Sequence, residues 1–422
     1  MIKQRDPAES LPTFGRDQDW PVVEGWLAVG GLPLTEFVQR LGSPCYLYSR
    51  ERIDRRIAQV RAALPRELEL LYPVKANPLP ALLQHIAGQV DGFDIASGGE
   101  LERALATGLT GARLSFAGPG KTDDELAEAV SAGALIVLES AGEAHRLAGL
   151  TGSRRPRVAL RINPPFELAP AAARMAGGAR KFGVDSEQAP RVLGEIARLP
   201  LEFEGFHCYP GSQCLDATAI IETQRATLDL AVELAAFAPV APRVLNLGGG
   251  FGVPCFAGES PLDLARLGAS LRSLTRDAAA RLPGARLTLE LGRFLVAEAG
   301  IYVCRVIERK RSRGKTILIV DGGLHHHWHA SGALEGRRHL HFPITVVTGH
   351  DSLVRSSVHA REVETVTVAG PLCAPHDVFA QDIELARAEA GDLVVIFQSG
   401  AYGATASPAG FLGRPPVSEM LI

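Results

Sequence analysis

Between about residue 45 and residue 300, short apolar runs alternate with longer amphipathic stretches that are rich in Ala and Leu. The run at 68–74 precedes a helix-like stretch at 80–87, and the same order recurs from there on. Further apolar runs lie at 92–96, 135–138, 158–162, 204–207, 244–247 and 287–291. Short apolar strands that alternate with amphipathic helices are typical of parallel βα units. About eight such strands over roughly 250 residues predict a (β/α)8 TIM-like barrel, with a doubly wound open sheet as the alternative.

After residue 300 the pattern changes to β-branched runs with few helical stretches between them. These runs lie at 301–310, 315–321, 344–347, 363–368 and 392–397. They predict a mostly antiparallel β domain, which a strand-like piece at 25–29 could join. We therefore expect an N-terminal segment at 1–44 that joins the β domain, a barrel at 45–300 and a C-terminal β domain at 301–422. The small-residue stretch at 169–178 is expected to be a loop.

Composition narrows the class of protein. Hydrophobic residues make up 46% of the 422 residues, which is enough for a sizeable core and excludes a largely disordered chain. The net charge of −3 disfavours a dedicated nucleic-acid binder. No apolar run approaches the ~20 residues that span a bilayer, and residues 1–10 lack the apolar stretch of a secretory signal. We expect a soluble cytoplasmic protein whose six scattered cysteines are free thiols.

Lys75 directly follows the first apolar run, and the Asn-Pro that comes after Ala76 stops the strand. In a barrel, the carboxyl ends of the strands carry the chemistry. A partly desolvated Lys there can have a lowered pKa and form a Schiff base. A solvated Lys that merely follows a strand is the alternative on this segment alone.

Three glycines, Gly248, Gly249 and Gly250, follow the run at 244–247. Glycines after a strand let backbone N–H groups approach a phosphate closely, although a tight βα turn needs the same residues. The segment has neither the Lys-Ser/Thr of a P-loop nor the spacing of a dinucleotide fingerprint.

Other candidates are weak when taken singly. Glu290 and Arg293 follow one strand, and His207 ends another. In the β region, turn residues surround Cys373, and a Gly-rich turn carries Tyr402. The order and spacing of all these segments together form the strong signal.

That order resembles the pyridoxal-phosphate decarboxylases of the alanine-racemase fold, the diaminopimelate/ornithine/arginine decarboxylase group. The resemblance covers about residues 44–418. It rests on Val-Lys75-Ala-Asn, Phe-Asp94-Ile-Ala-Ser-Gly-Gly-Glu100, His207 with Gly-Ser212-Gln, Gly-Gly-Gly-Phe-Gly, Glu290-x-Gly-Arg293, Gly-Pro-x-Cys373 and Gly-Ala-Tyr402-Gly. Phe116-Ala-Gly-Pro-Gly-Lys121 and Asp321-Gly-Gly-Leu-His-His-His327 resemble the exosortase-associated enzymes and those that decarboxylate a glutamyl group on an acyl carrier protein.

The resemblance implies pyridoxal phosphate as the cofactor and a role for each matched residue. Lys75 would carry the cofactor as a Schiff base, and Asp94 would lie beside it. His207 would stack on one face of the pyridine ring, while Glu290 would pair with the pyridine nitrogen. The phosphate would be held by Gly248, Gly249, Gly250, Arg293, Ser212 and Tyr402.

The resemblance also implies a homodimer with shared active sites. Cys373 would reach into the partner's site and act as the acid that reprotonates Cα. Glu290 favours decarboxylation, because a carboxylate keeps the pyridine nitrogen protonated and the ring a strong electron sink. Racemases of this fold carry Arg at that place, so an amino-acid racemase is the less favoured enzyme. A cofactor-carrying binding protein is disfavoured by the β domain with Cys373.

The chain departs from the family where the far end of the substrate would bind. Diaminopimelate and ornithine decarboxylases have an acid directly after the Cys, whereas this chain has Ala374. Their Arg-Pro-x-Leu-Tyr clamp is replaced by residues 323–330, which contain His325, His327 and His329. The loss of a distal clamp removes selectivity for a free diamino acid. We therefore expect an amino acid or a carrier-tethered aminoacyl group such as glutamyl, with a free diaminopimelate- or ornithine-type substrate as the alternative.

The histidines of this segment allow three interpretations, namely a metal site, a polar lining for the substrate and interface packing. On a strand, His325, His327 and His329 would share a face and could converge on a metal. A polar lining for the substrate's far end is the favoured interpretation, with interface packing next and no metal expected.

Overall fold

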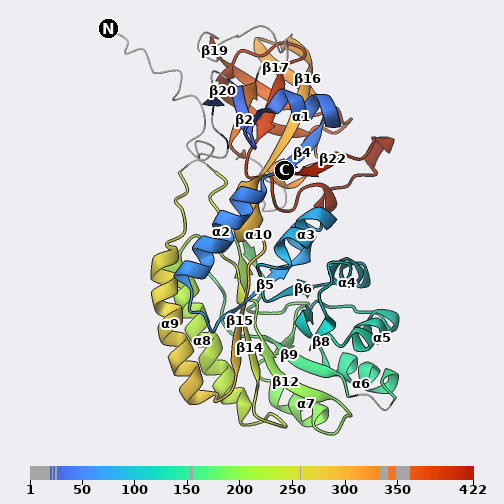
Figure 1. Ribbon diagram of the computed structural model, residues 1–422, viewed down its shortest axis with the longest axis vertical. Helices are drawn as coiled ribbons and strands as arrows, with labels where there is room; N and C mark the ends of the chain where they lie inside the picture. The colour runs from blue at the N-terminus through green and yellow to red at the C-terminus, as the bar shows by residue number, and fades with distance from the viewer. Residues whose placement is uncertain are drawn as a thin grey trace. The chain divides into compact units, whose positions relative to one another are not determined.

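The computed structural model describes residues 20, 22–23, 26–152, 155–256, 258–331, 341–347 and 362–422 (Figure 1). The segment at 1–10, on which the absence of a secretory signal was argued, lies outside these residues. The chain divides into two compact units. The barrel unit comprises Arg56–Val253 and Ser260–Phe294, and the β unit comprises Met1–Arg55, Pro254–Glu259 and Leu295–Ile422.

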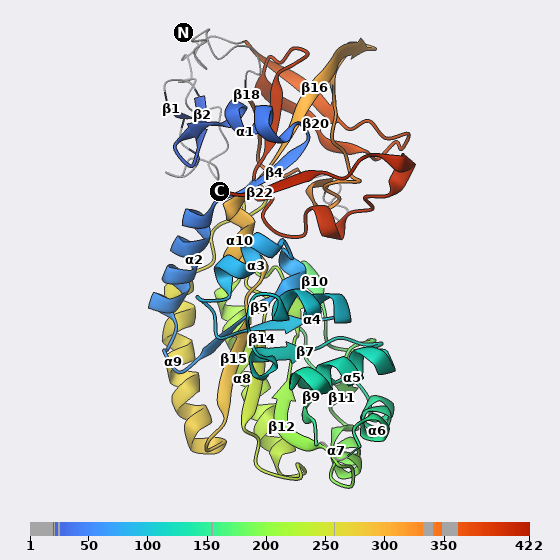
Figure 2. The same ribbon diagram turned by 45° about the vertical axis from the view of Figure 1, so that its right-hand side comes forward.

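Eight parallel strands form the barrel unit (Figure 2). Around the ring they are β5 (Glu69–Pro73), β6 (Gly92–Ile95), β7 (Leu114–Phe116), β8 (Leu135–Leu138), β9 (Arg157–Asn163), β12 (Glu202–His207), β14 (Val244–Gly249) and β15 (Arg286–Glu290). The sheet closes because β15 pairs with β5 and β8 pairs with β9. The predicted (β/α)8 barrel is therefore confirmed, and the open doubly wound sheet is excluded.

Helices follow the strands, and short polar side chains start many of them. The helices of the barrel are α3 (Pro80–Ile86), α4 (Gly98–Leu105), α5 (Asp123–Ala132), α6 (Ala141–Leu150), α7 (Ala189–Ile196), α8 (Ala217–Ala235) and α9 (Leu264–Arg281), with α2 (Arg50–Ala63) leading into β5. Ser97, Thr122 and Ser140 each accept a bond from a backbone N–H of the first turn, and Glu125 completes a capping box with Thr122. These caps fix where each helix begins after its strand.

Several short strands did not show in the hydrophobic pattern, among them β7 and β10 (Ala173–Arg174). β7 has three residues, between the 3₁₀ turn Gly111–Arg113 and the Gly-Pro-Gly that begins at Gly118, which is too short for a period to appear. The stretch at 169–178, predicted as a loop, contains β10. β10 pairs antiparallel with β13 (Gly211–Ser212).

The β unit is built around one long strand, β16 (Gly300–Ser312). It pairs antiparallel with β4 (Cys45–Tyr48), β17 (Lys315–Val320) and β21 (Leu393–Ile396), and β21 pairs antiparallel with β18 (Ile344–Val347). β19 (Val363–Ala369) and β20 (Val378–Ala386) extend the sheet, and β22 (Ser418–Leu421) adds to β4. The pairings β17–β19 and β4–β22 are parallel. The predicted mostly antiparallel sheet is confirmed.

The N-terminal part of the β unit differs in detail from the prediction. β2 (Trp26–Val29) does not enter the main sheet but forms a small one with β1 (Val22–Val23) and β3 (Leu32–Pro33), which α1 (Leu34–Leu41) follows. Leu27 and Val29 nevertheless share the core that the main sheet builds. β4, which the sequence placed in the barrel at 45–300, pairs with β16. A four-residue apolar strand before a helix has the same sequence pattern in a barrel and in a β domain. Only its hydrogen-bonded partner strand shows to which of the two β4 belongs.

Candidate active site

The carboxyl ends of the barrel strands bring together four of the residues that the sequence singled out. Lys75 lies in the 3₁₀ turn Val74–Ala76 directly after β5, and Asp94 lies in β6. His207 and Glu290 are the last residues of β12 and β15. The neighbouring strand order β15–β5–β6 puts the two carboxylates on either side of the strand that leads to Lys75.

On one side, Lys75 Nζ lies 3.4 Å from Asp94 Oδ2. The Asp94 side chain is 1% exposed, whereas that of Lys75 is 43% exposed. Asp94 Oδ1 has no hydrogen-bond partner among the described residues. Burial, and then the charge of Glu290, raises the pKa of Asp94 to about 8 against the opposing effect of Lys75. Asp94 is therefore largely protonated at neutral pH and presents an O–H in the site.

On the other side, Glu290 Oε1 accepts two hydrogen bonds. His207 Nε2 lies 2.9 Å away and Asn246 Nδ2 lies 2.7 Å away. Burial alone would raise the pKa of Glu290, but His207, its hydrogen bond, Lys75 and Asn246 together lower this pKa to about 2. Glu290 is therefore a carboxylate under all ordinary conditions, and the hydrogen on His207 that faces it must be on Nε2.

The glycine turn after β14 packs against the segment after β12. Gly248 and Gly250 have φ of +70° and +80°, and a Cβ at these positions would lie 2.5 Å from the oxygen of Cys208 and 2.4 Å from the oxygen of Gly211. A side chain is thus excluded at this turn for both conformational and steric reasons. Ser212 lies in β13 beside it, and the amide of Cys214 donates to Gly250 O at 2.9 Å.

Arg293 is buried three residues after Glu290, as the first residue of α10 (Arg293–Val296). The guanidinium of Arg293 and the backbone amides of the glycine turn are groups that bind a phosphate. An ionised Glu290 can pair with a protonated ring nitrogen. Lys75, with Asp94 beside it, supplies the amine that such a cofactor needs. These residues fit pyridoxal phosphate.

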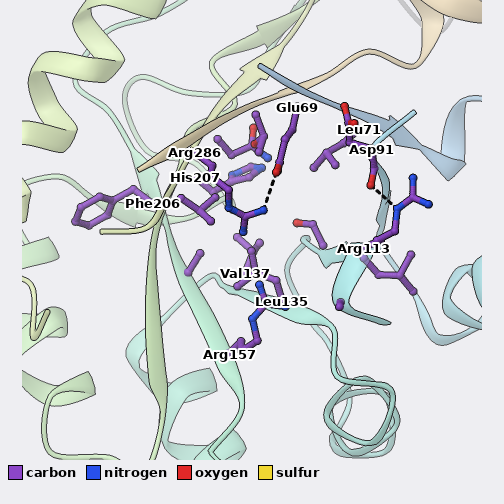
Figure 3. Close-up of a pocket in the computed structure, with 17 residues that line it drawn as sticks. Glu69, Leu71, Asp91, Arg113, Leu135, Val137, Arg157, Phe206, His207 and Arg286 are labelled. Atoms are coloured by element: carbon purple, nitrogen blue, oxygen red, sulfur yellow. Dashed lines mark hydrogen bonds and ion pairs between the residues drawn. The ribbon is translucent and has the colours of Figure 1, made fainter. Parts of the chain in front are cut away.

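A cavity lies inside the barrel among residues of several strands (Figure 3). It has a volume of about 310 Å³, and His207 and Asn246 line its inner end. Lys75, Asp94, Glu290 and the glycine turn are not among its lining residues, so it is separate from the candidate cofactor site.

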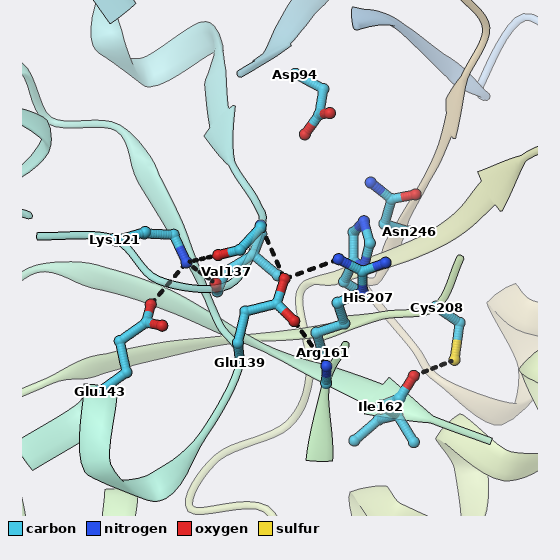
Figure 4. A network of polar contacts seen from close by, with 12 residues as sticks. Asp94, Lys121, Val137, Glu139, Glu143, Arg161, Ile162, His207, Cys208 and Asn246 are labelled. Carbon is cyan, nitrogen blue, oxygen red and sulfur yellow. Dashed lines mark hydrogen bonds and ion pairs between the residues drawn. The ribbon is translucent and has the colours of Figure 1, made fainter. Parts of the chain in front are cut away.

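A network of buried charges beside the site was missed by the sequence reasoning (Figure 4). Glu139, directly after β8, bonds Arg161 Nη1 at 2.7 Å and also accepts from the amides of Gly118 and Gly183. Burial raises the pKa of Glu139, but Arg161 and these bonds outweigh it and leave the pKa lowered. The strand-end rule that selected Lys75 and Glu290 would also have selected Glu139.

Lys121 and Glu143 extend this network. Lys121 Nζ lies 2.7 Å from Glu143 Oε1 and also donates to the carbonyls of Gly118 and Val137. Both side chains are almost fully buried. They tie the Gly-Pro-Gly segment after β7 to β8, which fixes the rim of the barrel next to Glu139.

Cys373 and Tyr402 belong to the β unit. Cys373 is an exposed free thiol in the turn between β19 and β20. Tyr402 follows β21 in the left-handed region, with φ of +54°, and its ring centroid lies 6.2 Å from that of His329.

The histidine segment at 325–329 is a series of turns, so the argument that alternate residues share a strand face was wrong. All four histidines are buried within the β unit. His327 Nε2 lies 2.9 Å from Ser399 Oγ, and His326 Nε2 donates to Pro415 O at 2.8 Å. The described residues contain no group of three His, Cys, Asp or Glu side chains that could hold a metal ion. In this chain the four histidines pack in the interior of the β unit, and a polar lining for the substrate's far end stays a prediction.

Comparison with known proteins decides the family. The model of the pyridoxal-binding domain of pyridoxal-dependent decarboxylases matches residues 50–297. The chain belongs to this family. The enzyme is a pyridoxal-phosphate-dependent decarboxylase, as the resemblance implied.

Relatives match along almost the whole chain. An L-glutamyl-[BtrI acyl-carrier protein] decarboxylase of Niallia circulans is 35% identical over 92% of this chain and 90% of its own length. A diaminopimelate decarboxylase of Deinococcus radiodurans is 34% identical over 92% of each chain. The structure of diaminopimelate decarboxylase from M. jannaschii with L-lysine has a TM-score of 0.85 at 25% identity, covering 99% of this chain and 94% of the other. Along the described residues, no helix has the length and apolarity that crossing a membrane requires.

Proposed function

We propose that this decarboxylase removes the α-carboxylate of an aminoacyl group, of the glutamyl type, that is tethered to a carrier protein. The observation that carries the proposal is the loop around Cys373, which offers no free acid for the ammonium of a diamino acid. The similarity to a glutamyl-carrier-protein decarboxylase supports it.

The acid in this loop is Asp377, and both of its oxygens are committed to the backbone. Asp377 Oδ1 accepts from the amide of Leu324 and Oδ2 from that of Leu372, each at 2.8 Å. Its side chain is buried, and a Cβ at Gly323 or Gly370 would collide with it. Asp377 therefore folds the loop instead of binding a substrate amine, and Ala374 adds no charge.

The bound cofactor supplies the electron sink for the pair left at Cα when CO₂ leaves. In our proposal, Lys75 would attach the cofactor, and Glu290 would hold the proton on the pyridine nitrogen. His207, whose Nε2 bonds Glu290, would lie against the ring. The glycine turn 248–250, Ser212, Arg293 and Tyr402 would hold the phosphate. Asp94 places a proton beside Lys75, and Cys373 delivers the proton to Cα.

CO₂ release from the cofactor-loaded protein tests the substrate. The panel contains free Lys, Orn, Arg, Glu and diaminopimelate, together with glutamyl and related groups on a carrier protein. We expect release from the tethered groups only. The second candidate, a free diaminopimelate decarboxylase, is favoured by the 34% identity to such an enzyme. Turnover of free diaminopimelate without turnover of any tethered group would establish it and refute the carrier proposal.

The role of Lys75 has a spectroscopic test. Lys75→Ala should abolish the visible absorbance of the covalently bound cofactor and the activity with it. Lys121→Arg is the matched control, because Lys121 is a lysine of the same barrel unit whose Nζ is committed to Glu143. A persistent absorbance band in Lys75→Ala would refute the assignment.

We also propose a homodimer whose sites are shared, with Cys373 donated by the partner subunit. Lys75→Ala chains mixed with Cys373→Ala chains should regain activity, because one site in each heterodimer keeps both residues. Neither variant alone should be active at more than a trace level. Mixed samples that exchange subunits, as seen by mass, but recover nothing would refute shared sites.

A further inference from the structure

The interior of this barrel holds a cavity between the amino ends and the middle of its strands. The interior of a (β/α)8 barrel is normally packed by layers of bulky branched side chains. Here the residues that line the cavity at mid-strand include Ser115 of β7, Ala159 of β9 and Thr288 of β15. These small residues leave the space of about 310 Å³, which is large enough for several water molecules.

The cavity runs from the amino ends of the barrel strands inward to His207 and Asn246. Its outer rim is formed by residues at the amino ends of the strands, where Arg286 Nη1 pairs with Glu69 Oε1 at 2.7 Å (Figure 3). The side chain of Arg286 is 51% exposed, whereas that of His207 at the inner end is 2% exposed. The cavity therefore joins solvent at the amino-terminal face to a residue that contacts Glu290.

Three buried polar atoms on the lining residues have no hydrogen-bond partner in the described part of the chain. They are Ser115 Oγ, Thr288 Oγ1 and His207 Nδ1. A buried polar atom without a hydrogen bond is unfavourable, so three around one cavity need something that bonds them. A polar, roomy cavity with several such partners is the kind that holds ordered water, whereas truly empty cavities are apolar.

We infer that this cavity is a water-binding site that positions His207 from behind. Nε2 of His207 is committed to Glu290, so water in the cavity bonds Nδ1, and Thr288 and Ser115 bond the water. The imidazole is then held at both nitrogens, with its plane fixed at the end of the barrel. The same water gives Nδ1 a route to exchange protons with solvent at the face opposite the cofactor site. Thr288 and Ser115 are positioning residues that act through this water.

A crystal structure of the purified protein, measured with and without xenon pressure, tests the occupant directly. We expect ordered water within hydrogen-bond distance of His207 Nδ1 and of at least one of the two hydroxyls, and no xenon in the cavity. Xenon binding in a cavity without ordered water would overturn the inference.

Thr288→Val tests the consequence for His207, because it keeps the shape and removes the hydroxyl. The readout is the ¹⁵N signals of the His207 ring in protein labelled at histidine, assigned by their loss in His207→Gln. We expect Thr288→Val to shift the Nδ1 signal and to speed or slow its exchange severalfold. Thr227→Val is the control, since Thr227 is buried in α8 and its hydroxyl donates to Thr223 O at 2.9 Å.

Ser115→Ala provides a second variant in case Thr288→Val does not fold. It should also displace ordered water and shift the Nδ1 signal. If the folded variant keeps the His207 Nδ1 signal and the ordered water of the wild type, Thr288 and Ser115 do not position His207.

Discussion

Two buried carboxylates flank the strand that leads to Lys75, and they reach opposite protonation states. Asp94 in β6 has a pKa raised to about 8, whereas Glu290 in β15 has one lowered to about 2. Burial raises the pKa on both sides, so burial does not explain the difference. The difference comes from the partners: Glu290 accepts from His207 and Asn246, but Asp94 faces a single half-exposed amine at 3.4 Å.

The comparison teaches how one barrel can supply an acid and an anion within the same site. Pairs of titratable groups whose environments push their pKa values apart commonly mark a site of proton chemistry. The permanent anion, Glu290, suits the task of holding a proton on the pyridine nitrogen. The neutral acid, Asp94, suits the task of lying beside Lys75 without binding it as a fixed salt bridge.

The most damaging change should be Glu290→Gln, which keeps the shape and removes the anion. We expect decarboxylation to slow by roughly 10²–10³-fold, as when a preorganised charge is removed from an active site. kcat with the best substrate of the panel measures this. If the Glu290→Gln variant keeps the circular dichroism spectrum and the full activity of the wild type, the charge of Glu290 is dispensable.

Asp94→Asn is the matched substitution on the other side and should behave differently. In the cofactor-free protein, the raised pKa lets native Asp94 keep its proton up to about pH 8, while the unfolded chain loses it near the ordinary Asp pKa of 3.8. The wild type should therefore lose stability as the pH rises from 4 to 8, by up to about 1.4 kcal/mol per pH unit. Asp94→Asn should lack this slope and be more stable at pH 7. Denaturant unfolding across this range measures it, and identical slopes would contradict the raised pKa.

The buried histidines of the β unit provide the opposite dependence on pH. Burial, and then the charge of His326, lowers the pKa of His325 to about 4. The unfolded chain binds this proton below pH 6.5 and the native state does not, so stability should fall as the pH drops from 6.5 to 4. Between pH 7 and pH 5, the free energy of unfolding of the wild type should fall by about 2 kcal/mol more than that of His325→Leu. Denaturant unfolding at both pH values measures the difference, and a parallel loss in the variant would contradict it.

The smallest effect is expected at an exposed ion pair of the barrel. Arg281 Nη1 lies 2.5 Å from Asp229 Oδ1, and their side chains are 42% and 63% exposed. Solvent screens such pairs, so Arg281→Ala should change the free energy of unfolding by less than about 1 kcal/mol. Thermal unfolding measures this. If Arg281→Ala lowered the free energy of unfolding as much as the loss of a buried ion pair does, solvent exposure would not explain the strength of this pair.

Much of the barrel was predictable because its strands are short apolar runs with helices between them. The ranges 135–138 and 141–150 coincide with β8 and α6, and the other named runs agree with strands to within about two residues. β7 and β20 were missed. β7 is too short for periodicity, and β20 contains Gln381, Asp382 and Glu384, which break an apolar run.

The candidate site was predictable in part. Lys75, Asp94, His207 and Glu290 stand at strand ends in recognisable segments, so the barrel topology was enough to gather them. Asn246 and Arg161 lie inside apolar runs, where the hydrophobic pattern gives no reason to single them out, whereas Glu139 directly follows β8 and met the strand-end rule. Their roles follow from contacts, and a contact such as the 2.7 Å bond from Asn246 to Glu290 joins residues 44 positions apart.

The sequence by itself determined the element order, the segments that carry chemistry and the resemblance that led to the family. Those features are local, since hydrophobic period, strand-end residues and turn glycines act over a few neighbours. Only the tertiary structure decided which carboxylate has the raised pKa, that β4 belongs with β16, and that a cavity lies inside the barrel. Each of these depends on strands that are distant in the chain but adjacent in space, where burial and hydrogen-bond partners are set.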